Sequence, residues 1–275
     1  METFLAQAPV LIGLLLFLGL FAGFVAGLLG VGGGLILVPG LLYIFRTLGY
    51  EADNIMHLAL GTSMATIILT GFSSAYAHHK RGSVRFDLVR TIGPGIVAGV
   101  IVGTYIADLL SGSALMLMFS CALFFFAGIM FVPPKTISHE FSGPKQPLAS
   151  LGGFVVGVVS ALMGIGGATL NVPFMTLNGV SIHQAVGSAS AMGILIAIPG
   201  TIGFMMIGMD AVGMPPFSLG FVNWMALLAV APLSIMAAPW GAHFAHKLPV
   251  KRLRAVFAVF ILIVAVEMLL ENLHG

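Results

Sequence analysis

The chain has 275 residues, of which 59% are hydrophobic and only 7% are charged, and its formal net charge is +2. Because a soluble domain carries roughly 25% charged residues, this composition excludes a soluble domain and predicts an all-α polytopic membrane protein. The single cysteine, Cys121, also excludes an internal disulfide and a metal cluster built on cysteine.

Apolar segments follow one another along the chain. The first, Val10–Leu29, is long enough to cross a bilayer at about 1.5 Å per residue, and no basic signal-peptide region precedes it, so we expect it to be retained. The next apolar segments are 35–45, 57–76, 91–107, 114–132, 148–163, 169–177 and 183–206, and two more follow. The polar linker 133–147 divides the chain into two transmembrane repeats, 1–132 and 148–275. We expect about eight to ten transmembrane segments.

A glycine-rich motif interrupts an apolar segment once in each half. Residues 30–39 read Gly-Val-Gly-Gly-Gly-Leu-Ile-Leu-Val-Pro, and residues 164–173 read Gly-Ile-Gly-Gly-Ala-Thr-Leu-Asn-Val-Pro. A span that begins with histidine follows each copy, at His57 and at His183. Motifs repeated in the same order predict an internal duplication. Each break either joins two tilted crossings or forms a re-entrant pair, and the short runs that follow favour helices that begin within the bilayer.

The positions of basic residues predict how the two repeats are oriented. Residues 78–90 hold four Lys or Arg, and the equivalent loop 208–220 holds none. Residues 246–254 hold four, and the equivalent loop 108–113 holds none. Because basic loops stay in the cytoplasm, equivalent loops lie on opposite sides of the membrane, so the repeats have inverted topology. The linker is then cytoplasmic, and both termini are external.

Two further sets of glycines are spaced by four residues, which places each set on one helix face. The first set is Gly19, Gly23 and Gly27, and the second is Gly95, Gly99 and Gly103. This spacing is typical of close helix packing in membranes. We expect Gly99→Ala on such a face to be much milder than a substitution at the glycine breaks.

The doubled Gly-x-Gly-Gly…Val-Pro element, followed by a His…Gly-[Ser/Thr] span, resembles the TauE/SafE family of bacterial sulfite and sulfonate exporters from about Leu11 to Leu270. The resemblance implies a secondary transporter of the bacterial inner membrane. Its expected substrates are small sulfur-containing anions such as sulfite, sulfoacetate or other sulfonates. A channel, or a carrier for another small solute or a metal cation, is the alternative. The expected partners are the small anion and the lipid bilayer, without nucleic acid or cofactor, and a homodimer stays open.

The glycine breaks are the predicted anion site. No Lys or Arg lies in the middle of a span, so we expect the anion to bind backbone N–H groups at helix N-termini that glycine leaves accessible. Glycines that serve only packing are the competing explanation. The expected substrate-binding residues are Gly32, Gly33, Gly34, Thr62, Ser63, Gly166, Gly167, Asn171, Ser188 and Ser190.

Other roles compete for several of these polar residues. The hydroxyls could instead bond helix carbonyls or hold helices together. His57 and His183 are candidates for energy coupling, although a place at the helix start explains them without a further role. No carboxylate lies at the centre of a span, with Glu267 the nearest, which argues against a carboxylate proton relay. Coupling through histidine, Na⁺ bound by carbonyls, and uniport stay open.

An intramembrane enzyme is the main competing class of function. The nucleophile motif Gly-x-Ser-x-Gly does not occur, and His139-Glu140 has Gly143 where a zinc protease needs its second histidine. The 16 methionines are scattered along the chain, which favours soft packing over copper handling. We therefore expect no enzymatic activity and no bound metal.

Overall fold

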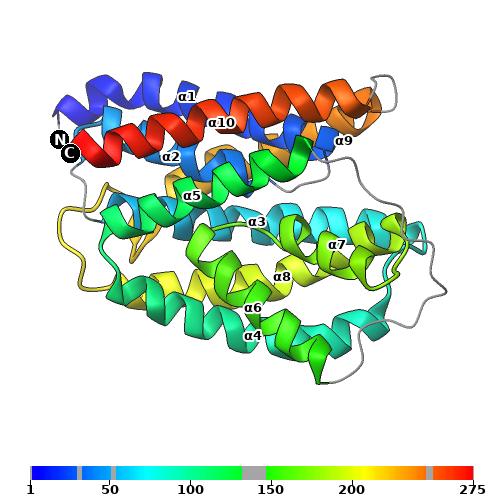
Figure 1. The fold of residues 1–275 in the computed structure, drawn as a ribbon. Helices are drawn as coiled ribbons and strands as arrows, with labels where there is room; N and C mark the ends of the chain where they lie inside the picture. Colours follow the sequence, from blue (N-terminus) through cyan, green and yellow to red (C-terminus); the bar gives the residue numbers. More distant parts are fainter. Residues whose placement is uncertain (1, 30–32, 51–53, 132–146, 246–249, 275) are drawn as a thin grey trace.

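The computed structural model describes residues 2–29, 33–50, 54–131, 147–245 and 250–274. These residues form a bundle of α-helices with one short antiparallel hairpin (Figure 1). The first five helices are α1 Glu2–Leu29, α2 Gly34–Thr47, α3 Ile55–Lys80, α4 Phe86–Leu109 and α5 Gly112–Phe131. The next three are α6 Leu148–Met163, α7 Ala168–Leu177 and α8 Ile182–Ile207. Strands β1 Ser218–Leu219 and β2 Val222–Asn223 then precede α9 Trp224–Ala245 and α10 Val250–His274.

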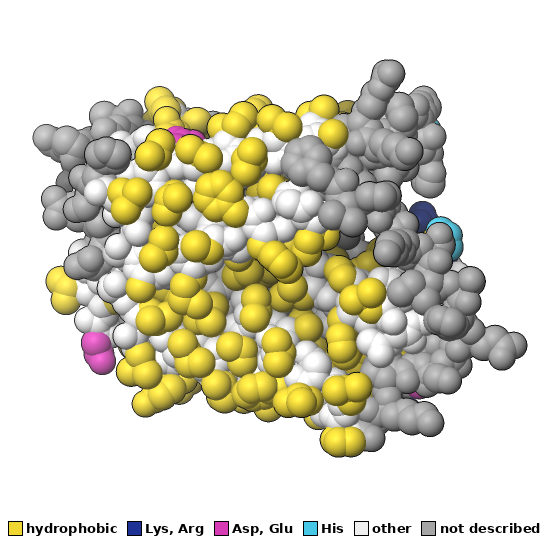
Figure 2. Space-filling view, in the orientation of Figure 1, with side chains coloured by type: hydrophobic (Ala, Val, Ile, Leu, Met, Phe, Trp, Pro, Cys, Tyr) yellow, Lys and Arg dark blue, Asp and Glu magenta, His cyan; other side chains and the backbone are white. Residues whose placement is uncertain are grey.

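Seven helices of the described chain are long and apolar enough to cross a membrane. The shorter apolar helices α2 and α6 have 14 and 16 residues, and α7 has 10. In Figure 2 the visible side of the bundle carries many exposed hydrophobic side chains, as a surface in contact with lipid requires. The predicted all-α polytopic membrane fold is confirmed. The short α2 and α7 each follow a glycine break, as the sequence predicted.

Helices of the two halves pack in reciprocal pairs. Helix α1 packs along α9, and α4 packs along α6, so the first helix of each half meets the fourth helix of the other. The third helices, α3 and α8, pack on each other, and so do the fifth helices, α5 and α10. Two halves related by a two-fold axis would make these pairs. The pairing supports the predicted duplication, while the inverted orientation in the membrane stays a prediction.

The glycines spaced by four lie at the two tightest of these helix pairs. Gly19 approaches Val230, and Gly23 and Gly27 approach the backbone of Ser234 and Ala238 in α9. The predicted packing role is therefore confirmed for this face.

The second glycine face makes the same kind of contact with α6. Gly95, Gly99 and Gly103 approach the backbone of Ser150, Phe154 and Val158. A Cβ at Gly99 would overlap the carbonyl oxygen of Phe154. The expectation that Gly99→Ala would be mild is wrong, because the two backbones touch there and neither can move without its helix.

The N-terminal end of α1 and the C-terminal end of α10 lie at the same end of the bundle, beside the loop that joins α8 to β1 (Figure 1). The connection from α3 to α4, which carries Arg81 and Arg85, lies at the opposite end. This arrangement agrees with the expectation that both termini lie on the same side of the membrane. Apart from Pro147, the predicted linker 133–147 lies outside the described residues.

Candidate functional site

The two glycine breaks meet each other inside the bundle. A Cβ at Gly34, the first residue of α2, would lie 2.8 Å from the Cα atom of Ile165 and 2.9 Å from the carbonyl oxygen of Gly164. Gly164 ends α6 in the left-handed region, at φ +57°, which favours glycine. Segments 130 residues apart are thus brought together, as a binding site formed by both repeats requires. Gly30 and Gly32 of the first break lie outside the described residues.

Helices α2 and α7 both begin at these breaks. The carbonyl oxygen of Gly33 accepts the N–H of Leu37 at 2.9 Å, and that of Gly167 accepts the N–H of Asn171 at 2.9 Å. The N–H of Ile36 also donates to the carbonyl oxygen of Gly33, at 3.0 Å. The N–H groups that come before these belong to the start of each helix, where the chain has no helical carbonyl four residues back. The positive ends of two helix dipoles therefore lie at the junction of the repeats, where they favour an anion.

The predicted site glycines differ in what they face. Gly34 and Gly167 contact backbone, since a Cβ at Gly167 would lie 2.8 Å from the carbonyl oxygen of Ala189 and 2.9 Å from the nitrogen of Gly193. Gly33 and Gly166 have side chains as their nearest neighbours, with Cβ positions 3.3 Å from Leu37 Cδ1 and 3.3 Å from Ile67 Cγ2. Close packing against backbone thus accounts for Gly34 and Gly167, whereas a Cβ at Gly33 or Gly166 would require only that one side chain shift by a few tenths of an ångström.

Asn171 is the most unusual polar residue of the site. It lies in the first turn of α7 with 0% of its surface exposed, and within the described chain neither its amide nitrogen nor its amide oxygen has a hydrogen-bond partner. Its Nδ2 atom is 3.0 Å from the Cβ position of Gly167, at the start of the helix. A buried amide without partners costs about 1–3 kcal/mol, so its retention calls for a ligand or water that bonds it.

The four predicted hydroxyls make bonds within the protein. Ser63 donates to the carbonyl oxygen of Gly164 at 2.7 Å and so holds the second break in place. Ser190 donates to the carbonyl oxygen of Val186 at 3.0 Å and lies 3.0 Å from the hydroxyl of Ser74. Of these two residues, Ser63 is the one that bonds a glycine break.

Thr62 and Ser188 make equivalent bonds in the two halves. The hydroxyl of Thr62 accepts the backbone N–H of Asn223 at 3.0 Å, just before α9. The hydroxyl of Ser188 accepts the backbone N–H of Arg85 at 2.9 Å, just before α4. Each bond ties the third helix of one repeat to the start of the fourth helix of the other. Sequence reasoning missed this partnership, although Arg85 and Asn223 are separated by the same offset that relates Gly82 to Gly220.

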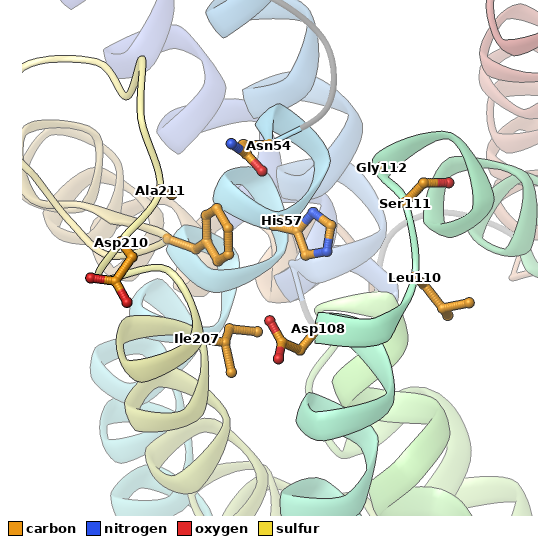
Figure 3. Close-up of a pocket in the computed structure, with 10 residues that line it drawn as sticks. Asn54, His57, Asp108, Leu110, Ser111, Gly112, Ile207, Asp210 and Ala211 are labelled. Atoms are coloured by element: carbon orange, nitrogen blue, oxygen red, sulfur yellow. The ribbon is translucent and has the colours of Figure 1, made fainter.

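The two matched histidines have different surroundings. His183 is exposed at the start of α8, whereas His57 is 5% exposed, and its ring stacks on Phe221 at 5.0 Å between centroids. The Nε2 atom of His57 lies 2.9 Å from the carbonyl oxygen of Ala107. His57 also lines a cavity of about 460 Å³ with Asp108 and Asp210 (Figure 3). His57 and His183 thus occupy matching positions in the two repeats, but their surroundings differ.

Within the described residues no group of three His, Cys, Asp or Glu side chains is placed to hold a metal ion. The glycine breaks instead present N–H groups, one free amide and apolar walls. Such a set of groups can bind an anion or a neutral polar solute without a metal or a cofactor.

The sequence matches the family model described as sulfite exporter TauE/SafE over residues 15–268. The chain belongs to this family. It is 37% identical over 259 residues to a probable membrane transporter protein of Haemophilus influenzae, with 94% of this chain and 98% of that protein covered. It is 27% identical to the probable membrane transporter protein YunE of Bacillus subtilis, with 95% and 98% covered. No solved structure matches the chain. This TauE/SafE protein is a multi-pass membrane transporter.

Proposed function

We propose that this TauE/SafE protein is a secondary transporter of the bacterial inner membrane that exports small sulfur-containing anions such as sulfite, sulfoacetate or other sulfonates. The anion lies where the two glycine breaks meet. It accepts hydrogen bonds from backbone N–H groups that begin α2 and α7 and from the amide of Asn171. Family membership supports the substrate class, because the family description names sulfite export.

The free amide of Asn171 is the observation that carries this proposal. Its NH₂ group can donate to a sulfonate oxygen, and its oxygen can accept from the hydroxyl of bisulfite. Because the side chain is fully buried, such bonds form away from bulk water, where an unmade bond is costly. The matching residue in the first break is Leu37, so the two breaks contribute unequally to the site.

The charges at the two ends of the bundle agree with export. Under the predicted topology, the basic segments 78–90 and 246–254 face the cytoplasm, and the loops at 108–113 and 208–220, with Asp108 and Asp210, face outward. A basic surface raises the local concentration of anions at the side of entry, and an acidic one favours their departure.

The test uses purified protein in proteoliposomes and two substitutions of one residue. Asn171→Asp keeps the shape of the side chain but replaces its donor with a negative charge, so it should abolish binding and transport of labelled sulfite and sulfoacetate. Asn171→Leu removes the donor without adding charge and should weaken binding about tenfold to hundredfold. Gly13→Ala on α1 is the matched control, because a Cβ there meets nothing within 4 Å.

Chromatography in detergent establishes that each variant is folded. Normal sulfite transport by folded Asn171→Asp would refute the site. If the wild-type protein binds and transports none of the sulfur anions but does transport a cation, the substrate class itself is wrong.

A further inference from the structure

A polar cavity lies at the end of the bundle where α3 begins and α4 ends. Its volume is about 460 Å³, and its walls include Asn54, His57, Asp108, Ser111 and Asp210. Figure 3 shows the His57 ring between the short connection that carries Ser111 and the side chain of Asp108, with Asp210 farther across. Under the predicted topology this end faces outward, so the cavity is a vestibule on the outer side.

The tautomer of His57 follows from its hydrogen bond. A carbonyl oxygen can only accept, so the Nε2 atom, 2.9 Å from the carbonyl oxygen of Ala107, must carry a hydrogen. In the neutral ring the Nδ1 atom then has a free lone pair. Within the described chain Nδ1 has no hydrogen-bond partner, and the residue is 5% exposed. A buried basic nitrogen without a partner therefore belongs to a residue that lines an acidic cavity.

We propose that this vestibule is the proton site of the transporter, and that His57 Nδ1 is the atom that takes the proton. The proposal rests on the proposed anion transport, to which proton movement is coupled. A hydronium ion entering the vestibule gives its proton to Nδ1, an N–H bond forms, and one water molecule is released. The imidazolium keeps its Nε2–H bond to Ala107 and places its new charge in a cavity with two carboxylates.

The charged groups around His57 determine how strongly the imidazolium is favoured. Asp108, at the end of α4, and Asp210, after α8, line the cavity with it. Helix α2, which packs on α3, brings Arg46, but Arg46 pairs with Glu271 of α10 and its guanidinium also contacts Met116 of α5. Glu51 and Asp53 precede α3 and lie outside the described residues. The described charges that share the cavity with His57 are thus both negative, which stabilises a bound cation.

A proton fits this cavity better than a metal ion does. The described residues contain no cluster of three metal-ligating side chains, and His57 is the one imidazole in the cavity wall. A single free lone pair, with carboxylates that stabilise the resulting charge, is sufficient for a proton. His183, its counterpart in the second repeat, is exposed. The proton site is therefore expected in the first repeat only.

Two measurements test the proposal, and the first does not depend on transport. Nitrogen NMR of protein labelled at histidine, with the His57 signals identified by their loss in His57→Gln, reports which ring nitrogens carry a hydrogen. We expect the Nε2–H tautomer in the neutral ring and a second N–H, at Nδ1, when the protein is acidified. Asp108→Asn and Asp210→Asn should weaken that second signal. A ring that never gains a hydrogen at Nδ1, or that responds to neither substitution, overturns the proposal.

The second measurement follows proton movement into proteoliposomes that contain a pH-sensitive dye, while a sulfite gradient drives anion exchange. His57→Gln should abolish anion-driven proton movement and keep anion binding, because its side-chain amide can still donate to Ala107. His243→Gln, at an exposed position of α9, is the matched control. Proton movement that survives in folded His57→Gln overturns the proton site. If the wild-type protein binds no sulfur anion, the proposed function is wrong. The NMR experiment would still test protonation of His57, because it does not depend on transport.

Discussion

The hydroxyl of Thr62 accepts the backbone N–H of Asn223 at 3.0 Å, although the two residues are 161 positions apart. Thr62 is 0% exposed, so this bond fixes the start of α9 against the middle of the bundle. Ser188 of α8 accepts the backbone N–H of Arg85, just before α4, in the same way. We infer that the pair of bonds sets how the third and fourth helices of opposite repeats are joined.

The first prediction concerns this pair of bonds. Thr62→Val keeps the shape of the side chain but leaves the buried N–H of Asn223 without its acceptor, so it should lower the free energy of unfolding by about 1–3 kcal/mol. Ser188→Ala should have a similar but smaller effect, because Arg85 lies nearer the surface. Thermal or denaturant unfolding in detergent measures both. An unchanged stability in Thr62→Val would show that water replaces the lost acceptor.

The second prediction separates stability from function at Asn171. An amide that is buried without partners destabilises the protein in the absence of ligand, so Asn171→Leu should raise the melting temperature of the ligand-free protein while it weakens anion binding. Thermal-shift curves with and without sulfite measure both effects on one sample. A lower melting temperature in the ligand-free variant would indicate that Asn171 bonds protein or tightly held water instead of an anion.

The third prediction concerns access to the start of α7. A Cβ at Gly193 would lie 3.4 Å from the backbone nitrogen of Gly167, an ordinary contact distance, so Gly193→Ala covers that N–H without forcing helices apart. We expect folded protein with anion affinity lowered about tenfold or more, the loss of one hydrogen bond to a charged ligand. Gly167→Val should instead lose folded protein, because its side chain would overlap α8. Normal sulfite binding by Gly193→Ala would leave this helix N-terminus without a role.

The fourth prediction concerns the orientation in the membrane. In a Cys121→Ser background, a cysteine at Ser83 should resist an impermeant thiol reagent applied to intact cells, while cysteines at Asp108 and Asp210 should react with it. The reason is that the basic connection at 78–90 is expected in the cytoplasm and the acidic end outside. Labelling of Ser83 and Asp210 from the same side would refute the inverted repeats.

The fifth prediction concerns Glu267, the carboxylate nearest the centre of a span. It is exposed on α10 and does not line the vestibule of His57. Glu267→Gln should therefore leave sulfite transport and its coupled proton movement intact. Complete loss of transport with normal expression would place a cation site on α10 and remove the need for one at His57.

Much of the fold could be predicted because it depends on local or repeated features of the chain. Hydropathy identifies the spans, since partition into lipid depends on the composition of each segment. Spacing by four identified Gly23 and Gly99 as packing positions, because helix geometry alone places such residues on one face. The cost of Gly99→Ala could not be predicted, since it depends on the distance to the backbone of Phe154, which belongs to another helix.

The candidate site, like the fold, could be predicted only in part. The sequence by itself determined that two glycine breaks exist, that Asn171 breaks their symmetry, and that the chain belongs with membrane transporters. Only the tertiary structure decided that Gly167 contacts α8 while Gly166 does not, and that Thr62 and Ser188 bond backbone N–H groups. It also buried His57 in the wall of a cavity and left His183 exposed. These outcomes depend on which distant segments meet, because similar local motifs acquire different neighbours when the chain folds.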